Sequence, residues 1–162
     1  GRIHSADTLN MPYEDLRKGR FSRSGHVYCM TTVTAGRARL FSDIRCGRLV
    51  VGEMRRLHDD SLLQSIAWVL MPDHLHWLFQ LGDVADLSSA MKLFKARSAR
   101  TLNQYLHRTG SIWQKSYYDH ALRGDEDLRK LARYIVANPL RAGLVSNIGE
   151  YSLWDTAWLE EG

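Results

Sequence analysis

Cysteine is scarce in this chain, and it has no long apolar run. Only Cys29 and Cys46 occur among 162 residues, and they form no CxxC or similar pair. Two cysteines cannot build a disulfide framework, so the sequence predicts a reducing, cytoplasmic environment. No stretch approaches the roughly 18 apolar residues of a membrane span, and the first residues lack the apolar segment of a signal peptide. We therefore expect no membrane partner.

The sequence also has no internal repeat and no low-complexity tract. Hydrophobic residues make up 44% and charged residues 25% of the chain, which is ordinary for a folded protein. A length of 162 residues fits one domain over 1–162, with 1–25 as a polar, basic N-terminal arm. Lys and Arg number 22 against 18 Asp and Glu, a net charge of +4 that is compatible with a nucleic-acid partner.

Hydrophobic periodicity and breaker residues predict the order of the elements. Strands are expected at 26–34, 66–71, 74–79 and within 112–122, and helices at 43–59 and 86–107. A last helix begins after Asp125, with Glu126 and Asp127 in its first turn, and ends before Pro139. The predicted class is α+β, a ferredoxin-like split βαβ fold: an antiparallel sheet with helices on one face and an extra C-terminal helix.

Two histidines stand two residues apart on the second arm of the predicted hairpin. Side chains at i and i+2 of a strand point to the same face, so His74 and His76 project together while Leu75 and Trp77 point the other way. Two imidazoles on one face are what a shared metal ion needs. The pattern fits equally well two histidines on a half-exposed face.

A tyrosine and an asparagine are four residues apart near the end of the last predicted helix. This spacing predicts that Tyr134 and Asn138 share a helix face, beside the apolar stripe of Leu131 and Ile135. Tyr134 is then either a packing residue or a reactive phenol. Asn138 is either a ligand or a residue that satisfies a local backbone group.

Basic residues form two groups that suit a phosphate backbone, although a solvated surface would look the same. Arg17, Lys18 and Arg20 lie in the N-terminal arm, and Lys92, Lys95, Arg97 and Arg100 lie on the long helix. An aromatic and polar group, Tyr117, Tyr118 and His120, suits either base stacking or strand packing.

Several short motifs, taken together, resemble a known family. The segment Met71-Pro-Asp-His-Leu-His76 resembles the HUH motif of single-tyrosine transposases, and Arg133 to Val145 resembles the helix that carries their nucleophile. Leu16 to Ser22, Ile112 to His120 and the Asn-Pro-x-Arg-Ala-Gly segment are similar to REP-associated tyrosine transposases. The resemblance covers the chain from about Leu16 to Trp154.

The resemblance implies a site and a reaction. His74 and His76 match the metal-binding histidines, Tyr134 the nucleophile, and Asn138 the residue that completes the metal site. The implied cofactor is a divalent metal, Mg²⁺ or Mn²⁺, with no small-molecule cofactor. The implied activity is cleavage and rejoining of single-stranded or hairpin DNA at repetitive extragenic sequences through a 5′-phosphotyrosine, at the bacterial nucleoid, by a monomer or homodimer. Asp73 replaces the usual asparagine, and the tail after Tyr151 diverges.

Three other functions remain open from the residues. A non-catalytic single-stranded nucleic-acid-binding module with a ferredoxin-like fold would explain the basic helix and the aromatics, but not the histidine, tyrosine and asparagine pattern. A metal hydrolase of a small substrate would need a general base that the sequence does not place beside the histidines. A replication or conjugative relaxase shares the histidine motif but is typically longer.

Overall fold

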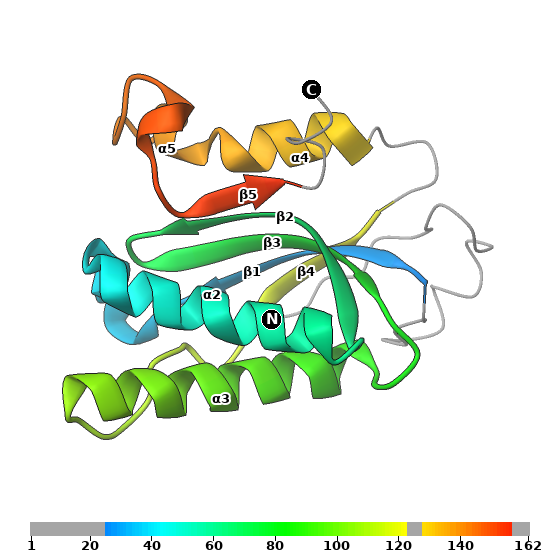
Figure 1. Cartoon of the computed structure of the whole chain (residues 1–162), viewed down its shortest axis with the longest axis horizontal. Coiled ribbons are helices and arrows are strands. Elements are labelled where there is room, and N and C mark those ends of the chain that lie inside the picture. Colours follow the sequence, from blue (N-terminus) through cyan, green and yellow to red (C-terminus); the bar gives the residue numbers. More distant parts are fainter. Residues whose placement is uncertain (1–24, 123–127, 157–162) are drawn as a thin grey trace.

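The strands form one antiparallel sheet between two layers of helices. The computed structural model describes residues 25–122 and 128–156. Its strands are β1 (Val27–Val33), β2 (Leu63–Met71), β3 (His74–Leu81), β4 (Tyr118–Ala121) and β5 (Trp154–Thr156), paired in the order β4-β1-β3-β2-β5. Helices α2 (Ile44–Asp59) and α3 (Leu87–Leu106) cover one face, and α4 (Leu128–Val136) with the short α5 (Asn138–Arg141) lies on the other (Figure 1). Single 3₁₀ turns occur at Ala35–Arg37, Leu40–Ser42 and Ile148–Glu150.

The predicted ferredoxin-like plan is confirmed. The elements β1, α2, β2, β3, α3 and β4 follow one another in that order, and all sheet neighbours run antiparallel. The strand β5 adds a further edge beside β2, and no periodic pattern in the sequence predicted so short a strand. In this strand order β3 is the middle strand of the sheet. Because helices cover both faces, β3 has buried side chains on both.

Both long helices begin where the sequence places a capping aspartate. The Asp43 carboxylate accepts a hydrogen bond of 2.9 Å from the Arg45 amide, and Asp86 accepts one of 2.8 Å from Ser89. Each bond satisfies an amide that the first helical turn leaves without a partner. The helix α3 ends at Leu106, and its C-cap residue His107 takes a left-handed conformation with φ 53°.

Alternation along β3 divides the interior into two cores. Leu75, Trp77, Phe79 and Leu81 pack against α2 and α3, whereas Leu78 packs with the residues under α4. The second core also takes in the buried apolar side of α4: Ala132, Ile135 and Val136. The face of the sheet under α4 is therefore the face that receives the even-numbered side chains of β3.

The extended segment predicted over 112–122 is a strand only at Tyr118–Ala121, so the predicted strand was too long. Ahead of it, Trp113 makes an isolated bridge to Thr34 and buries its ring in the core under α3. Its indole N–H donates to the Ser98 hydroxyl at 2.9 Å, and that hydroxyl donates to the Phe94 carbonyl at 2.7 Å. The buried hydroxyl of Ser98, in the apolar stripe of α3, thus both accepts and donates a hydrogen bond.

The last predicted helix is in fact two helices. Because α4 ends at Val136 and α5 begins at Asn138, Tyr134 and Asn138 do not share one continuous helix, and that expectation was wrong. Pro139 stands in the first turn of α5, where its missing amide hydrogen is not needed. The predicted cap Asp125, with Glu126 and Asp127, falls outside the described residues.

Two glycines provide a matched test of how closely the chain segments around Ser61 and Gly82 pack. A Cβ at Gly82 would overlap the backbone oxygen of Ser61, while a Cβ at Gly52, in the middle of α2, meets nothing within 4 Å. We expect Gly82→Ala to lower the free energy of unfolding by about 1–3 kcal/mol, because backbone atoms must move. Gly52→Ala should raise it by about 0.5–1 kcal/mol through helix propensity.

Urea denaturation of both variants measures these changes. A stable Gly82→Ala protein with an unchanged midpoint would contradict the close approach of the two chain segments.

Candidate active site

The two histidines of β3 point to the face that α4 covers. His74 and His76 are half-buried, and their rings lie 4.8 Å apart, nearly perpendicular. They lie on the same side of β3 as Leu78, which packs under α4, and opposite Leu75 and Trp77. The two side chains therefore point to the same face of the sheet, as their spacing predicted.

Each histidine has its Nδ1 atom held by a neighbouring side chain. The Nδ1 atom of His76 lies 2.8 Å from the hydroxyl of Thr31, its partner on β1. The Nδ1 atom of His74 lies 2.7 Å from a carboxylate oxygen of Asp73. With both Nδ1 atoms engaged in this way, the Nε2 atoms are the nitrogens left to coordinate, as in metal sites whose ligands are oriented by outer partners.

The turn residue Asp73 has a definite place in this arrangement. Its second oxygen accepts a hydrogen bond of 3.1 Å from Arg37. Burial alone would raise the pKa of Asp73, but the hydrogen bonds and charges of His74 and Arg37 outweigh it and lower that pKa. The Arg37 side chain is 62% exposed, so the pair contributes at most about 1 kcal/mol of stability. The main effect of the Arg37–Asp73 pair is to orient the carboxylate that contacts His74.

His76 is held in its neutral form. Burial, together with the charges of His74 and Arg141, lowers the pKa of His76 to about 4. An imidazole must be neutral before it can bind a metal ion through its free nitrogen. At neutral pH this ring is therefore ready to act as a ligand.

Tyr134 lies on the exposed side of α4. Its side chain is 62% exposed, and the guanidinium carbon of Arg141 lies 3.8 Å from the centre of its ring. A cation–π contact at an exposed site contributes about 0.5–1 kcal/mol, which favours one ring position without burying it. The charge of Arg141 also contributes to the lowered pKa of His76, after burial and the charge of His74.

Asn138 begins α5, a helix that packs against β2. Its amide N–H donates to the Ile135 carbonyl at 2.8 Å, which leaves the amide oxygen as the atom that could bind a ligand. Within 25–122 and 128–156, no group of three or more His, Cys, Asp or Glu could hold a metal ion. Two imidazole nitrogens with one amide oxygen do fit a divalent ion that takes mixed nitrogen and oxygen ligands.

The comparisons with known proteins identify the family. The family model described as "Transposase IS200 like" matches residues 22–138. The chain belongs to this family. The resemblance to REP-associated tyrosine transposases that the motifs indicated is likewise confirmed, and the prediction of such a transposase holds at the level of the family.

Individual relatives agree with this assignment. A REP-associated tyrosine transposase of Escherichia coli strain K12 is 34% identical over 96 residues, covering 57% of this chain and 53% of the relative. A second relative, from Haemophilus influenzae, is 29% identical over 98 residues, covering 54% of this chain and 56% of its own. The chain thus spans about half the length of the curated relatives it matches.

A solved structure has the same fold. It is that of a REP-associated tyrosine transposase bound to a REP hairpin, with a TM-score of 0.69 and 22% identity. The match covers 88% of this chain and 81% of that one.

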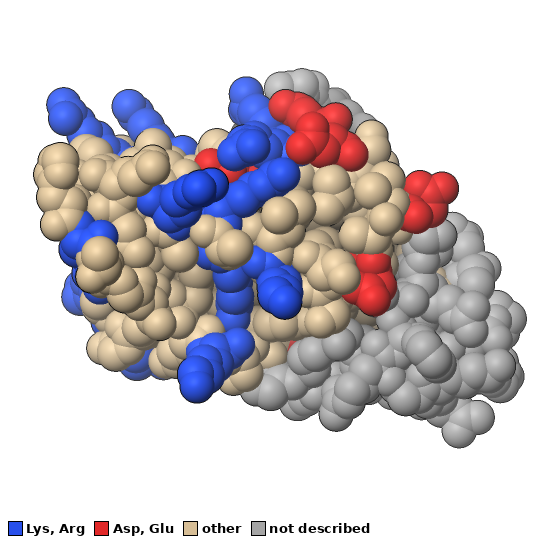
Figure 2. All heavy atoms as spheres, turned by 90° about the horizontal axis from the view of Figure 1, so that it is seen from below, with Lys and Arg blue, Asp and Glu red and all other residues tan. Residues whose placement is uncertain are grey.

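The basic residues of α3 lie on the other face of the sheet from the histidines. Figure 2 shows Lys and Arg gathered across the side of the molecule on which α3 lies. The side chains of Lys92 and Arg100 are exposed. Lys95 instead donates to the carbonyls of Gln114 and Ser116 at 2.8 and 3.1 Å, and burial lowers its pKa to about 8.

The remaining basic candidates differ in their surroundings. Arg97 lies 3.8 Å from Asp60 in a loose ion pair. The predicted arm residues Arg17, Lys18 and Arg20 lie outside the described residues. Of the candidates on α3, Lys92 and Arg100 are thus the two with exposed side chains, and the structure does not bring either of them to the histidine pair.

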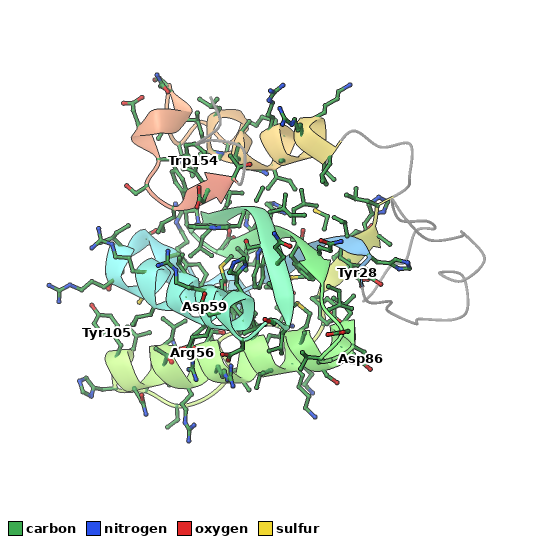
Figure 3. The ribbon with its side chains drawn as sticks, turned by 45° about the vertical axis from the view of Figure 1, so that its right-hand side comes forward. Tyr28, Arg56, Asp59, Asp86, Tyr105 and Trp154 are labelled. Carbon is green, nitrogen blue, oxygen red and sulfur yellow. The ribbon has the colours of Figure 1, made fainter. Side chains whose placement is uncertain are left out.

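The two faces meet at one end of the sheet. Near the C-terminal end of α3, Tyr105 donates to the Asp43 carboxylate at the start of α2, at 3.2 Å (Figure 3). Close by in sequence, the Phe41 amide donates to the carbonyl of Pro72, in the turn that precedes His74. The basic helix thus ends near the turn that carries the histidines.

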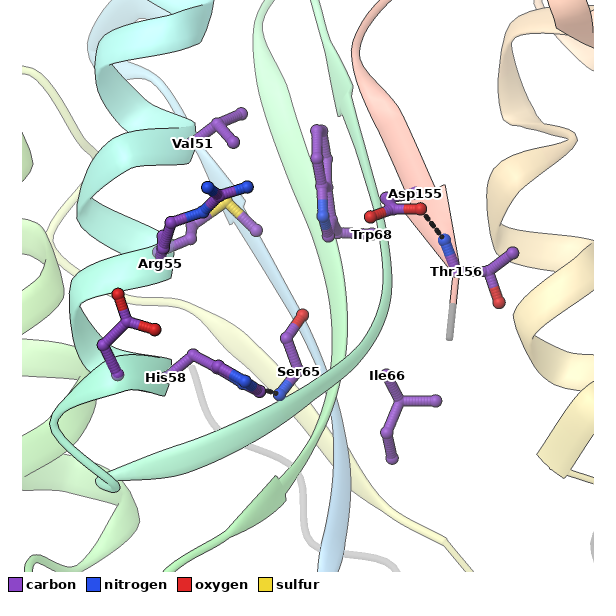
Figure 4. Close-up of a pocket in the computed structure, with 10 residues that line it drawn as sticks. Val51, Arg55, His58, Ser65, Ile66, Trp68, Asp155 and Thr156 are labelled. Atoms are coloured by element: carbon purple, nitrogen blue, oxygen red, sulfur yellow. Dashed lines mark hydrogen bonds between the residues drawn. The ribbon is translucent and has the colours of Figure 1, made fainter. Parts of the chain in front are cut away.

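A separate cavity of about 420 Å³ opens between α2, β2 and β5 (Figure 4). Trp68, Arg55 and Asp155 are among the residues that line it. None of the predicted site residues lies in its wall. The candidate active site is instead a surface arrangement around the histidine pair.

Sequence reasoning missed two residues of this site. Thr31 lies in a strand that was recognised only by its β-branched composition, and its pairing with His76 depends on the sheet register. Arg141 belongs to the Asn-Pro-x-Arg segment that carried part of the resemblance, but its contact with Tyr134 needs the break between α4 and α5. As for membranes, none of the helices in the described ranges is long and apolar enough to cross one.

The low pKa of His76 predicts loss of stability in acid. The pKa of His76 is about 4 in the folded protein and about 6.5 in the unfolded chain. As the pH falls from 6.5 towards 4, the unfolded chain binds the proton first, so the folded state should lose up to about 3 kcal/mol. Chemical denaturation at a series of pH values measures this loss.

The substitution His76→Asn keeps a polar atom beside Thr31 and should flatten that part of the profile. His107→Asn is the control, because the side chain of His107 is exposed and asparagine tolerates its left-handed conformation. If His76→Asn retains the full acid loss, the protonation of another group is responsible.

Proposed function

We propose that this chain is a metal-dependent, single-strand DNA endonuclease and strand transferase. It would cleave and rejoin DNA at repetitive hairpin sequences through a 5′-phosphotyrosine formed on Tyr134. The observation that carries the proposal is the orientation of the histidine pair: both Nδ1 atoms have partners, so both Nε2 atoms remain on the face that α4 covers. A pair of structural histidines would not require this common arrangement.

In the proposed reaction Tyr134 supplies the nucleophile. The Tyr134 oxygen attacks the phosphorus, a P–O bond to tyrosine forms, and the bond from phosphorus to the 3′ oxygen breaks. The phenolic proton ends on that oxygen, so the released end is a 3′-hydroxyl. Because the phosphodiester is exchanged and not hydrolysed, the released hydroxyl can attack in turn and rejoin the strand.

Mg²⁺ or Mn²⁺ would be held by His74, His76 and the amide oxygen of Asn138. When bound, such an ion polarises the phosphate and offsets the charge that gathers during transfer. Thr31 and Asp73 keep the two imidazoles turned for this task, and the low pKa of His76 keeps its ring neutral. The exposed position of Tyr134 suits a nucleophile that must reach a polymer.

The proposed DNA is a hairpin with unpaired flanks. The solved relative with the same fold is bound to a REP hairpin. An unpaired strand can bring its phosphate to the rim of the sheet, whereas a duplex holds that phosphate within a helical backbone. This activity would place the protein at the bacterial nucleoid, as the resemblance to the family implies.

Strand polarity gives the sharpest test of the proposal. Hairpin DNA with single-stranded flanks is incubated with Mn²⁺ or Mg²⁺, labelled at either end, and run on a denaturing gel. The 3′-end label should move with the protein, and the 5′-labelled fragment should be free and extendable by a polymerase. Tyr134→Phe should abolish the adduct, and so should the double substitution His74→Ala with His76→Ala.

Tyr118→Phe is the matched control, because Tyr118 is also exposed but belongs to β4. An adduct that persists in Tyr134→Phe would assign the nucleophile elsewhere. Hairpin binding without any adduct, across both metals and several hairpins, would favour a non-catalytic nucleic-acid-binding module.

The exposed basic residues of α3 should contribute to DNA affinity through phosphate contacts. Each phosphate contact on a duplex contributes about 0.9 to the slope of log affinity against log salt concentration. Lys92→Ala and Arg100→Ala should therefore each reduce that slope by about 1. Fluorescence anisotropy of labelled hairpin DNA at several salt concentrations measures the slope.

Lys95→Met is the comparison variant, since the Lys95 ammonium binds backbone carbonyls. It should lower the free energy of unfolding by about 1–2 kcal/mol and leave the salt slope unchanged. Equal slopes for wild type, Lys92→Ala and Arg100→Ala would exclude this face from DNA binding.

A further inference from the structure

Arg141 is placed on the tyrosine by the break between α4 and α5. It ends α5, and its guanidinium carbon lies 3.8 Å from the centre of the Tyr134 ring. At this distance the cation lies against the face of the ring, whose oxygen is left uncovered at the edge. The contact holds the phenol from one side without occupying the reactive atom.

The donors of Arg141 have no other partner in the part of the chain that the structure describes. Within 25–122 and 128–156, no hydrogen bond or ion pair engages its guanidinium. A guanidinium is planar, so one that lies against a ring keeps its N–H groups pointing outward around its own edge. Such a fork matches the geometry of phosphate oxygens. The exposed Arg141 side chain therefore presents an edge that can bind phosphate directly beside Tyr134.

The charge of Arg141 also reaches the histidine pair, as its effect on His76 indicates. Another cation, Arg133, precedes the tyrosine on α4 and makes no contact with its ring within the described residues. A phosphate attacked by the Tyr134 oxygen would lie beside this ring, within reach of the Arg141 side chain stacked on it.

We propose that Arg141 is a substrate-contacting residue of the strand-cleavage site. It orients the Tyr134 ring by stacking and donates its edge N–H groups to a non-bridging oxygen of the scissile phosphate. The inference rests on the proposed function and goes beyond it by assigning a further catalytic residue. In the step, the Tyr134 oxygen bonds to phosphorus, the bond to the 3′ oxygen breaks, and the phenolic proton passes to that oxygen. Arg141 gives up no proton.

A neutral phosphate analogue tests this contact directly. Single-turnover adduct formation is measured with hairpin DNA carrying either a normal phosphate or a methylphosphonate at the cut. The methylphosphonate lacks one charged oxygen, so an arginine that binds that oxygen has little left to stabilise. Arg141→Gln should slow the reaction roughly 100-fold on phosphate and less than about 5-fold on methylphosphonate, each relative to wild type.

Arg133→Gln is the matched control, because it removes the same charge from an exposed side chain one residue from Tyr134. It should change both rates less than about 3-fold. Arg141→Lys keeps the charge but loses the planar fork, and it should recover only part of the rate on phosphate. Thermal unfolding checks that all variants fold.

The outcomes separate the inference from the proposed function. An equal defect of Arg141→Gln on both substrates would mean that the arginine acts only through structure, and it would overturn the inference alone. No adduct with wild type on any hairpin would overturn both the inference and the proposed function. Nuclear magnetic resonance gives a further check in the free protein, where the Arg141 side-chain protons should shift upfield. Absence of that shift, or its persistence in Tyr134→Leu, would also overturn the stacking.

Discussion

The two-residue period of β3 is the constraint on which the rest of the structure depends. This strand lies in the middle of the sheet, so alternate side chains must serve two different surroundings. Leu75, Trp77 and Phe79 fill the core beneath α2 and α3, while His74 and His76 are directed to the other face. A shift of one residue would place the histidines in the core beneath α2 and α3 and turn Trp77 and Phe79 to the α4 side. The apolar core therefore fixes the direction of the polar pair.

Orientation of each imidazole then comes from a second layer of contacts. Thr31 reaches His76 because β1 and β3 pair in a register that places them opposite one another. Asp73 reaches His74 from the turn, and Arg37 holds the same carboxylate from a second turn. The exposed Arg37–Asp73 contact contributes little stability. Together, however, these contacts engage one ring nitrogen of each histidine and leave the other for a ligand. Sheet register and turn geometry thus determine which nitrogen of each imidazole can bind a ligand.

Most of the fold could be predicted from the sequence because short-range features, helix caps and alternating apolar residues, determine its helices and strands. Asp43 and Asp86 cap helices whose first amides need acceptors, and alternation in β3 followed from its apolar residues. The break ahead of Pro139 was placed too late, because a proline is tolerated in a first turn and so does not say where the previous helix stops. The contact of Arg141 with Tyr134 depends on that break, so no spacing rule could have found it.

The placement of charge limits how DNA could meet this protein. The exposed cations Lys92 and Arg100 lie on the α3 side, and the histidine pair lies on the α4 side. The proposed DNA would have to pass round the sheet to touch both, and one route is the end where α3 approaches the β2–β3 turn. A stiff duplex resists so tight a path, whereas a hairpin joined to an unpaired flank has a flexible junction where it can bend. The arrangement thus favours a substrate whose duplex and single-stranded parts are bound on different faces.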